Sequence, residues 1–109
     1  TGQVVGTPEY MAPEQASGNA SQAGPAADIY SIGATLYCML AGHPPFRSSH
    51  SVETLRKVLE QDPISLRKFN RTIPADLETI CLRCLEKQPG KRYPDAASLA
   101  QDLQRFLRG

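Results

Sequence analysis

The sequence predicts a small all-α domain. Apolar residues recur at helical spacing in four separate segments, and capping or breaking residues flank each segment. We find no convincing strand pattern, no internal repeat and no low-complexity tract. The length of 109 residues allows one domain, and a hydrophobic content of 40% permits a packed core.

Residues 1–27 are predicted to be irregular, because Gly and Pro interrupt any long periodic run, apart from a short helical turn near Pro13. The strongest helix is predicted over 28–41. Asp28 is a natural N-cap, and Gly42 offers a C-terminal stop. This helix is apolar nearly all round, so we expect it to be buried in the domain. Gly33 in its interior suggests a close backbone approach.

The second helix is predicted over 52–61, with a cap near Ser51. Its apolar stripe comprises Val52, Leu55, Val58 and Leu59. Residues 63–73 are predicted to be a loop, and a third helix is predicted over 76–87. The apolar face of the third helix comprises Leu77, Ile80, Cys81, Cys84 and Leu85. Asp95 is predicted to cap the last helix.

The charge is balanced overall, with 12 Lys and Arg against 11 Asp and Glu, a net charge of +1. This balance argues against nucleic acid or an anionic membrane as the main partner. Residues 1–46 contain no Lys or Arg, so a buried Glu14 must find its cationic partner further along the chain. The most apolar stretch, 32–41, is too short to span a bilayer, and no secretory signal is visible. Three cysteines fit a reducing compartment better than a disulfide framework.

The segment from Gly6 to Glu14 reads G-T-P-E-Y-M-A-P-E. It resembles the peptide-positioning loop of serine/threonine protein kinases and ends in their A-P-E signature. The same family's motifs follow in order, as D-I-Y-S-I-G at 28–33, G-H-P-P-F at 42–46 and C-L-E-K-Q-P-G-K-R at 84–92. The resemblance covers nearly all of the chain, and the sequence looks most like the bacterial members of this family.

The resemblance implies that residues 1–109 are a C-terminal part of a kinase domain, whose complete fold is α+β with two lobes. Residues 1–27 would end the activation segment, and residues 28–109 would supply helices of the C-lobe. The parent would use ATP and Mg²⁺ to phosphorylate Ser or Thr of protein substrates. The sequence has no Gly-rich loop, V-A-I-K Lys, H-R-D Asp or D-F-G Asp. We therefore expect no catalytic residue, no metal ligand and no ATP binding in this chain, which alone should be inactive and poorly stable.

Individual roles follow from the same resemblance. Gly6, Thr7 and Pro8 match the loop that positions the substrate, although Thr7 could also be an ordinary turn residue. Thr1 lies six residues before Thr7, the spacing of an activating phosphothreonine in related bacterial kinases. A plain loop threonine is an equal alternative for Thr1.

Three further residues have structural roles in the family. Glu14 and Arg92 match an ion pair that fastens the activation segment to the C-lobe; the alternative for Arg92 is a solvated surface residue. Asp28 matches the aspartate that anchors the catalytic loop, a role compatible with helix capping.

Two clusters of residues can be interpreted either as functional sites or as ordinary core and surface residues. Cys81 and Cys84 are spaced like zinc or redox ligands, but their place on an apolar stripe favours small core residues. Arg67, Lys68 and Arg71 could meet acidic substrates, although a solvated basic loop is favoured.

Two other functions stay open at this stage. The parent could be a pseudokinase, acting as a binding or scaffold module, or the chain could be a free-standing helical interaction module. For the kinase, the expected partners are protein substrates and the remainder of the kinase domain, with no nucleic acid. The expected compartment is the cytoplasm, with a membrane anchor only elsewhere in the parent.

Overall fold

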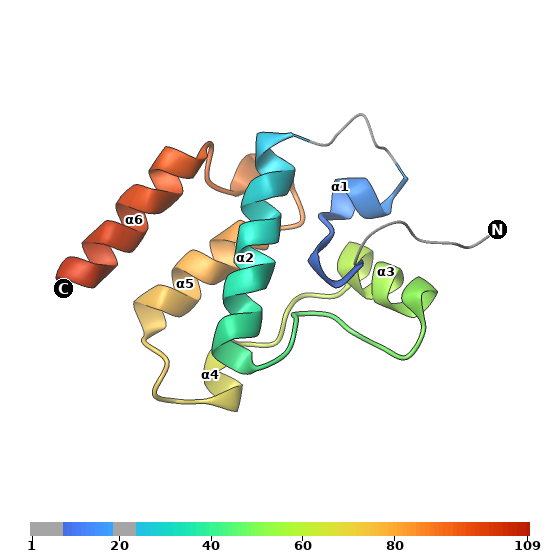
Figure 1. Ribbon diagram of the computed structural model, residues 1–109, viewed down its shortest axis with the longest axis horizontal. Coiled ribbons are helices and arrows are strands. Elements are labelled where there is room, and N and C mark those ends of the chain that lie inside the picture. The colour runs from blue at the N-terminus through green and yellow to red at the C-terminus, as the bar shows by residue number, and fades with distance from the viewer. Residues whose placement is uncertain (1–7, 19–23) are drawn as a thin grey trace.

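The computed structural model describes residues 8–18 and 24–109. The helical elements are η1 (Pro8–Tyr10), α1 (Pro13–Ala16), α2 (Pro25–Ala41), α3 (Ser51–Glu60), α4 (Leu66–Phe69), α5 (Ala75–Cys84), η3 (Pro89–Lys91) and α6 (Ala96–Arg108). Figure 1 shows α2 at the centre, with α5 and α6 on one side and η1, α1 and α3 on the other. The described residues contain no strand, which confirms the all-α prediction.

Helix α2 begins earlier than predicted. Its first residue is Pro25 and its N-cap is Gly24, so Asp28 lies in the first turn and is not the N-cap. Proline favours the first helical position because its φ is already helical and its missing N–H is not needed there. Asp28 still sits where the helix dipole favours an acid. The predicted stop at Gly42 is confirmed: its φ is 87°, and its N–H donates to the carbonyl of Cys38 at 2.8 Å.

The core consists of two clusters of buried side chains, and α2 contributes to both. One contains Ala12, Ala27, Tyr30, Ala34, Tyr37, Leu66, Ile73, Cys81 and Leu85. The other contains Ile29, Ile80, Cys84, Tyr93 and Leu99, against which Leu103 and Phe106 of α6 pack. The expectation that α2 is buried on all sides is wrong for one part of its surface. In the described structure Met39 is 77% exposed and Ile32 is 44% exposed.

Helices α2 and α5 approach closely at Gly33, as the sequence predicted. A Cβ atom at Gly33 would overlap the Cβ of Cys84 and would lie 3.4 Å from the carbonyl oxygen of Cys81. The thiol of Cys81 in turn donates to the carbonyl of Gly33 at 3.4 Å. Glycine is therefore required here by the space available, at a cost of about 1 kcal/mol in helix propensity.

The buried face of α3 differs from the predicted stripe. Val58 is buried as expected, but Val52 is 67% exposed and Leu59 is 40% exposed, while Thr54 takes a buried position. The Thr54 hydroxyl donates to the carbonyl of His50 at 3.3 Å, so burial leaves it satisfied. A threonine whose hydroxyl donates to a carbonyl of its own helix can occupy an apolar face. The hydropathy pattern therefore did not predict that Thr54 is buried.

The predicted loop at 63–73 contains a short helix, α4, which the sequence did not indicate. The carboxylate of Glu78 on α5 accepts hydrogen bonds from the Ser65 hydroxyl and, at 3.1 Å, from the Arg67 backbone N–H. Leu66 is fully buried below them. The cap comes from a distant residue, so no local sequence signal announces this helix.

The last two helices follow their predictions more closely. Helix α5 covers residues 75–84 and ends before the predicted 87, with Pro74 as its N-cap. Asp95 caps α6 as predicted, because its carboxylate accepts from the Ser98 N–H at 2.7 Å. None of the helices in the described ranges has both the length and the apolar character that crossing a membrane requires.

Candidate functional site

The candidate site is built on the segment from Pro8 to Ser17, which carries the A-P-E residues. Pro13 begins α1, and the N–H of the buried Ala12 donates to the Gln15 side chain at 3.1 Å. The Ser31 hydroxyl of α2 donates to the carbonyl of Tyr10 at 2.9 Å. Figure 1 shows this segment between α2 and α3. Local capping and one bond to the central helix thus hold the segment in place.

Glu14 and Arg92 meet in a two-pronged ion pair. Arg92 Nη1 lies 2.8 Å from Glu14 Oε2, and Nη2 lies 2.8 Å from Oε1. The side chain of Arg92 is 0% exposed and that of Glu14 is 10% exposed. Such paired parallel bonds are the strongest geometry that an arginine and a carboxylate adopt. The structure therefore brings together two residues that lie 78 positions apart in the sequence.

Arg92 also reaches three backbone carbonyls. Its Nε donates to Glu86 at 2.7 Å, Nη1 to Ala26 at 2.9 Å and Nη2 to Lys87 at 3.2 Å. An arginine carries five N–H donors, and with the two bonds to Glu14 all five have partners. One side chain thus joins α1, the first turn of α2 and the turn that follows α5.

The electrostatics of the pair favour the ionised carboxylate. The hydrogen bonds from Arg92 lower the pKa of Glu14 below its ordinary value, and burial opposes this shift only in part. Tyr30 lies below the guanidinium, whose carbon is 5.1 Å from the ring centroid. Burial raises the pKa of Tyr30, so the phenol stays neutral beside the ion pair.

Of the remaining predicted site residues, the structure describes only Asp28 and Pro8. Asp28 is exposed on the first turn of α2, and the catalytic loop it was expected to anchor is not in this sequence. Pro8 begins η1. Thr1, Gly6 and Thr7 lie outside the described residues.

Sequence reasoning missed Lys87, a half-buried lysine near the ion pair. Its Nζ is buried and has no hydrogen-bond partner in residues 8–18 and 24–109. The Nζ lies 4.4 Å from the centroid of the Phe46 ring. Burial lowers the pKa of Lys87, and the nearby Asp62 partly opposes this. Phe46 is distant in sequence, so no local pattern marks Lys87 as buried.

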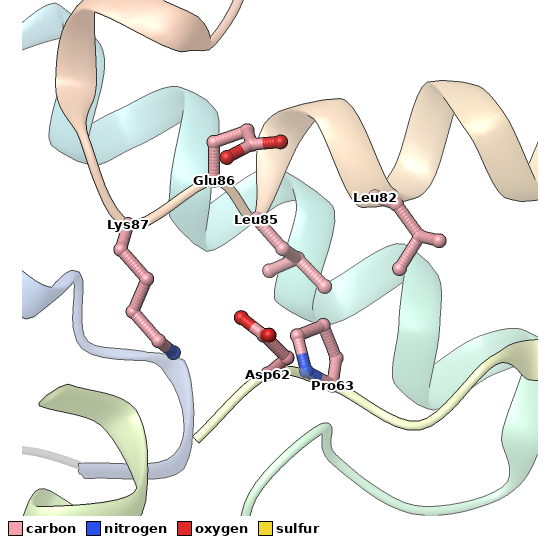
Figure 2. A pocket seen from close by; sticks show the side chains of 6 residues that line it. All are labelled: Asp62, Pro63, Leu82, Leu85, Glu86 and Lys87. Carbon is pink, nitrogen blue, oxygen red and sulfur yellow. The ribbon is translucent and has the colours of Figure 1, made fainter. Parts of the chain in front are cut away.

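Lys87 lines a hollow of about 360 Å³ below the end of α5. The residues that line it are Asp62, Pro63, Leu82, Leu85, Glu86 and Lys87. Figure 2 shows the Lys87 side chain running from the turn after α5 toward the segment around Asp62. The hollow combines one cation with two carboxylates, so its charge selects neither an anion nor a cation clearly.

Cys81 and Cys84 lie in the core clusters described above. Burial raises the pKa of Cys81 to about 12 and that of Cys84 to about 11. Both thiols are therefore protonated at neutral pH and behave as small core side chains, since the thiolate is the reactive and metal-binding form.

Comparison with known proteins places this arrangement in a family. The protein kinase domain family matches residues 1–103. The chain is 38% identical over all its 109 residues to the serine/threonine-protein kinase PknB of Mycobacterium tuberculosis, of which it spans 17%. It is 38% identical over 109 residues to PkaA of Streptomyces coelicolor and 32% identical over 105 residues to PksC of the same organism, which are both named serine/threonine-protein kinases. It spans 19% of PkaA and 18% of PksC.

The chain belongs to the protein kinase domain family. It corresponds to a C-terminal part of that domain, and the relatives named above are all bacterial. The fold agrees with the helical C-lobe of a protein kinase.

Proposed function

We propose that this chain acts as part of a serine/threonine protein kinase, which transfers the γ-phosphoryl group of ATP to Ser or Thr of protein substrates. Within it, residues 1–27 end the activation segment and residues 28–109 form the C-lobe helices that support this segment. The observation that carries the proposal is the Glu14–Arg92 pair, because it fastens the A-P-E segment to the helical core through a fully bonded guanidinium. The names of the bacterial relatives support the same activity.

We assign the positioning of the protein substrate to this chain, and the binding and chemistry of ATP to other parts of the kinase domain. No group of three or more His, Cys, Asp or Glu side chains in the described ranges could hold a metal ion. We assign no step of phosphoryl transfer to the described residues. ATP and Mg²⁺ belong to the complete kinase domain, and the chain alone is expected to be inactive.

Within the complete domain, Gly6, Thr7 and Pro8 would position the substrate peptide. A short hydroxyl on a rigid loop suits this task, because small misplacements of reacting groups cost large factors in rate. Asp28 would anchor the catalytic loop, because its carboxylate is exposed and has room for several N–H donors. Thr1 would be an activating phosphorylation site.

The exposed apolar surface of α2 supports the view that further kinase residues pack on this chain. A hollow of about 380 Å³ lies on this surface, lined by Ser31, Ile32, Thr35, Leu36, Met39 and Leu103. Exposed apolar surface of this kind marks an interface or an aggregation hazard. We therefore assign the remainder of the kinase domain to it and expect the chain alone to be poorly stable. The assigned compartment is the cytoplasm, and no role for nucleic acid is proposed.

The test uses the complete kinase domain with Mg²⁺-ATP and matched peptides that carry Ser, Thr or Tyr. Transfer to Ser and Thr peptides and not to Tyr peptides is expected. Thr7→Ala should lower the rate by roughly 10–100-fold without changing the melting temperature, whereas Thr7→Ser should retain most activity. The exposed Thr79 of α5 supplies the control variant, Thr79→Ala, which should leave the rate unchanged.

Two results would contradict the proposal. A complete domain that stays folded but transfers no phosphoryl group would instead be a pseudokinase, a binding or scaffold module. ATP hydrolysis by the purified 109-residue chain would contradict the assignment of nucleotide chemistry to residues outside it.

A further inference from the structure

The segment of residues 63–75 concentrates positive charge. It contains Arg67, Lys68 and Arg71 and no acidic residue, a net charge of +3 in a chain whose total is only +1. All three side chains are exposed. The proposed kinase function makes no use of them.

These cations line one hollow. A concave surface of about 600 Å³ is bounded by Ser65, Arg67, Lys68 and Arg71, and we call it the basic hollow. Within residues 8–18 and 24–109, none of its three cations forms an ion pair, whereas Arg56, Arg92 and Arg105 all pair with carboxylates. The basic hollow thus holds three cationic groups that make no ion pair with a carboxylate of the described residues.

The acid that faces this segment is already engaged. Glu78 accepts hydrogen bonds from the Ser65 hydroxyl and the Arg67 backbone N–H. These contacts lower the pKa of Glu78, so it is ionised at neutral pH. Its carboxylate fixes the start of α4 and leaves a net charge of +2 at the basic hollow. The loop is therefore held in place by a bond network that leaves the guanidinium and ammonium groups available.

We propose that the basic hollow binds a phosphorylated Ser or Thr side chain of a partner protein. A phosphate monoester carries a charge of roughly −1.5 to −2 at pH 7 and three acceptor oxygens, which matches the net charge of the basic hollow. Two arginines offer planar pairs of donors that suit phosphate, and a lysine adds a point charge. Clusters of arginines are a recurring means of recognising phosphorylated segments. The inference goes beyond the proposed catalytic function and does not depend on it.

A membrane surface fits the basic hollow less well. The three cations line a single hollow, and the net charge of +1 for the chain gives little attraction to an anionic bilayer. A lone phosphate group on a flexible peptide can enter such a concavity.

The experiment measures fluorescence anisotropy of a labelled phosphothreonine peptide with the complete kinase domain. The same peptide with Thr or Glu at that position distinguishes a phosphate from no charge and from a carboxylate. The test variant is R67Q/K68Q/R71Q. The matched control is R47Q/K91Q/R108Q, which removes the same charge from exposed positions outside the basic hollow.

The phosphopeptide should bind the unmutated kinase domain roughly tenfold or more tightly than it binds the test variant. The control variant should lose less than about twofold, because exposed charges at a distance are screened by salt. Equal losses in both triple variants would overturn the proposal in favour of general electrostatic attraction.

Two further measurements separate other anionic ligands. Equal affinity for the Glu peptide would overturn phosphate recognition and leave an acidic-peptide site. Binding to vesicles of phosphatidylserine and phosphatidylcholine that depends on the three cations, without binding of the phosphopeptide, would overturn it in favour of a membrane surface. Because neither readout uses catalytic turnover, failure here is distinguishable from failure of the kinase proposal.

Discussion

Replacing Arg92 should destabilise the complete kinase domain more than any other single change at the candidate site. Arg92→Met keeps much of the side-chain length but removes all five hydrogen bonds that the guanidinium makes. The Glu14 carboxylate and three carbonyl oxygens then lose their shared donor in a place with almost no access to water. Removing one partner of a buried ion pair in this way costs about 3–5 kcal/mol.

Thermal unfolding measures this loss. For a domain of 150–250 residues, each kcal/mol lowers the melting temperature by about 2–4 °C, so the expected drop lies between about 6 and 20 °C. Arg92→Lys should also destabilise, because an ammonium has fewer donors and cannot bind the carboxylate in a two-pronged way. Glu14→Gln and the double variant complete a cycle that separates the pair from the carbonyl contacts.

The pH dependence gives an independent check on the same pair. The pKa of Glu14 is lower in the folded state than in the unfolded chain. The stability that this carboxylate contributes is therefore fully present above its unfolded pKa, and it is lost as the pH falls through the folded pKa. The stability difference between the parent protein and Glu14→Gln should shrink over that acidic range.

Three results would refute the reasoning. A loss below about 1 kcal/mol for Arg92→Met would place the pair among weak surface salt bridges. Equal stability of Arg92→Lys and the parent protein would show that the planar geometry is unimportant. Additive effects of Glu14→Gln and Arg92→Met in the double variant would show that the two side chains do not stabilise each other.

The remaining predictions concern the core. Gly33→Ala should destabilise the complete domain by about 1–3 kcal/mol, because the new methyl group overlaps the Cβ of Cys84. Gly90→Ala, where a Cβ meets nothing within 4 Å, is the control in the same melting assay, and equal effects would contradict the close approach. Lys87→Met should stabilise by about 1 kcal/mol, because it removes a buried donor that has no partner in the described residues. Since burial lowers the pKa of Lys87, the unfolded chain binds more protons than the folded one between the lowered folded pKa and the ordinary value; the stability of the unmutated domain should rise with pH in that range, and Lys87→Met should lack the rise. The thiols of Cys81 and Cys84 should resist alkylation by iodoacetamide in the native protein and react on unfolding; fast native labelling of either would contradict their burial and raised pKa values.

Much of the helical fold was predictable because its signals are local. Asp95 caps α6 with its own side chain, and Gly42 ends α2 in the left-handed conformation that glycine adopts easily. Where two local signals competed, the prediction of the boundary was wrong: Pro25 begins α2, not Asp28, because proline suits the first helical position. The close approach at Gly33 was also predictable, since a glycine inside an apolar helix lowers helix propensity without a local gain.

Other elements depend on contacts between distant residues. Helix α4 is capped by Glu78 from the next helix, and Thr54 replaces apolar residues on the buried face of α3 because its hydroxyl bonds to its own backbone. The sequence around α4 contains no sign of Glu78, whereas Thr54 bonds to His50 only four residues away and is buried through the packing of α3. Periodicity can identify a helix, but the side on which it packs is chosen by its neighbours in space.

The sequence by itself determined the family of this chain, its helical class and the pairing partners Glu14 and Arg92, since the order of short motifs carries that information. Only the tertiary structure decided that Arg92 uses all its donors, that the Lys87 ammonium is buried beside Phe46, and that three cations line the basic hollow without an ion pair to the described residues. The physical reason is that burial and charge pairing depend on which residues meet in space. A linear sequence specifies the chemical groups, and the fold sets the distances between them.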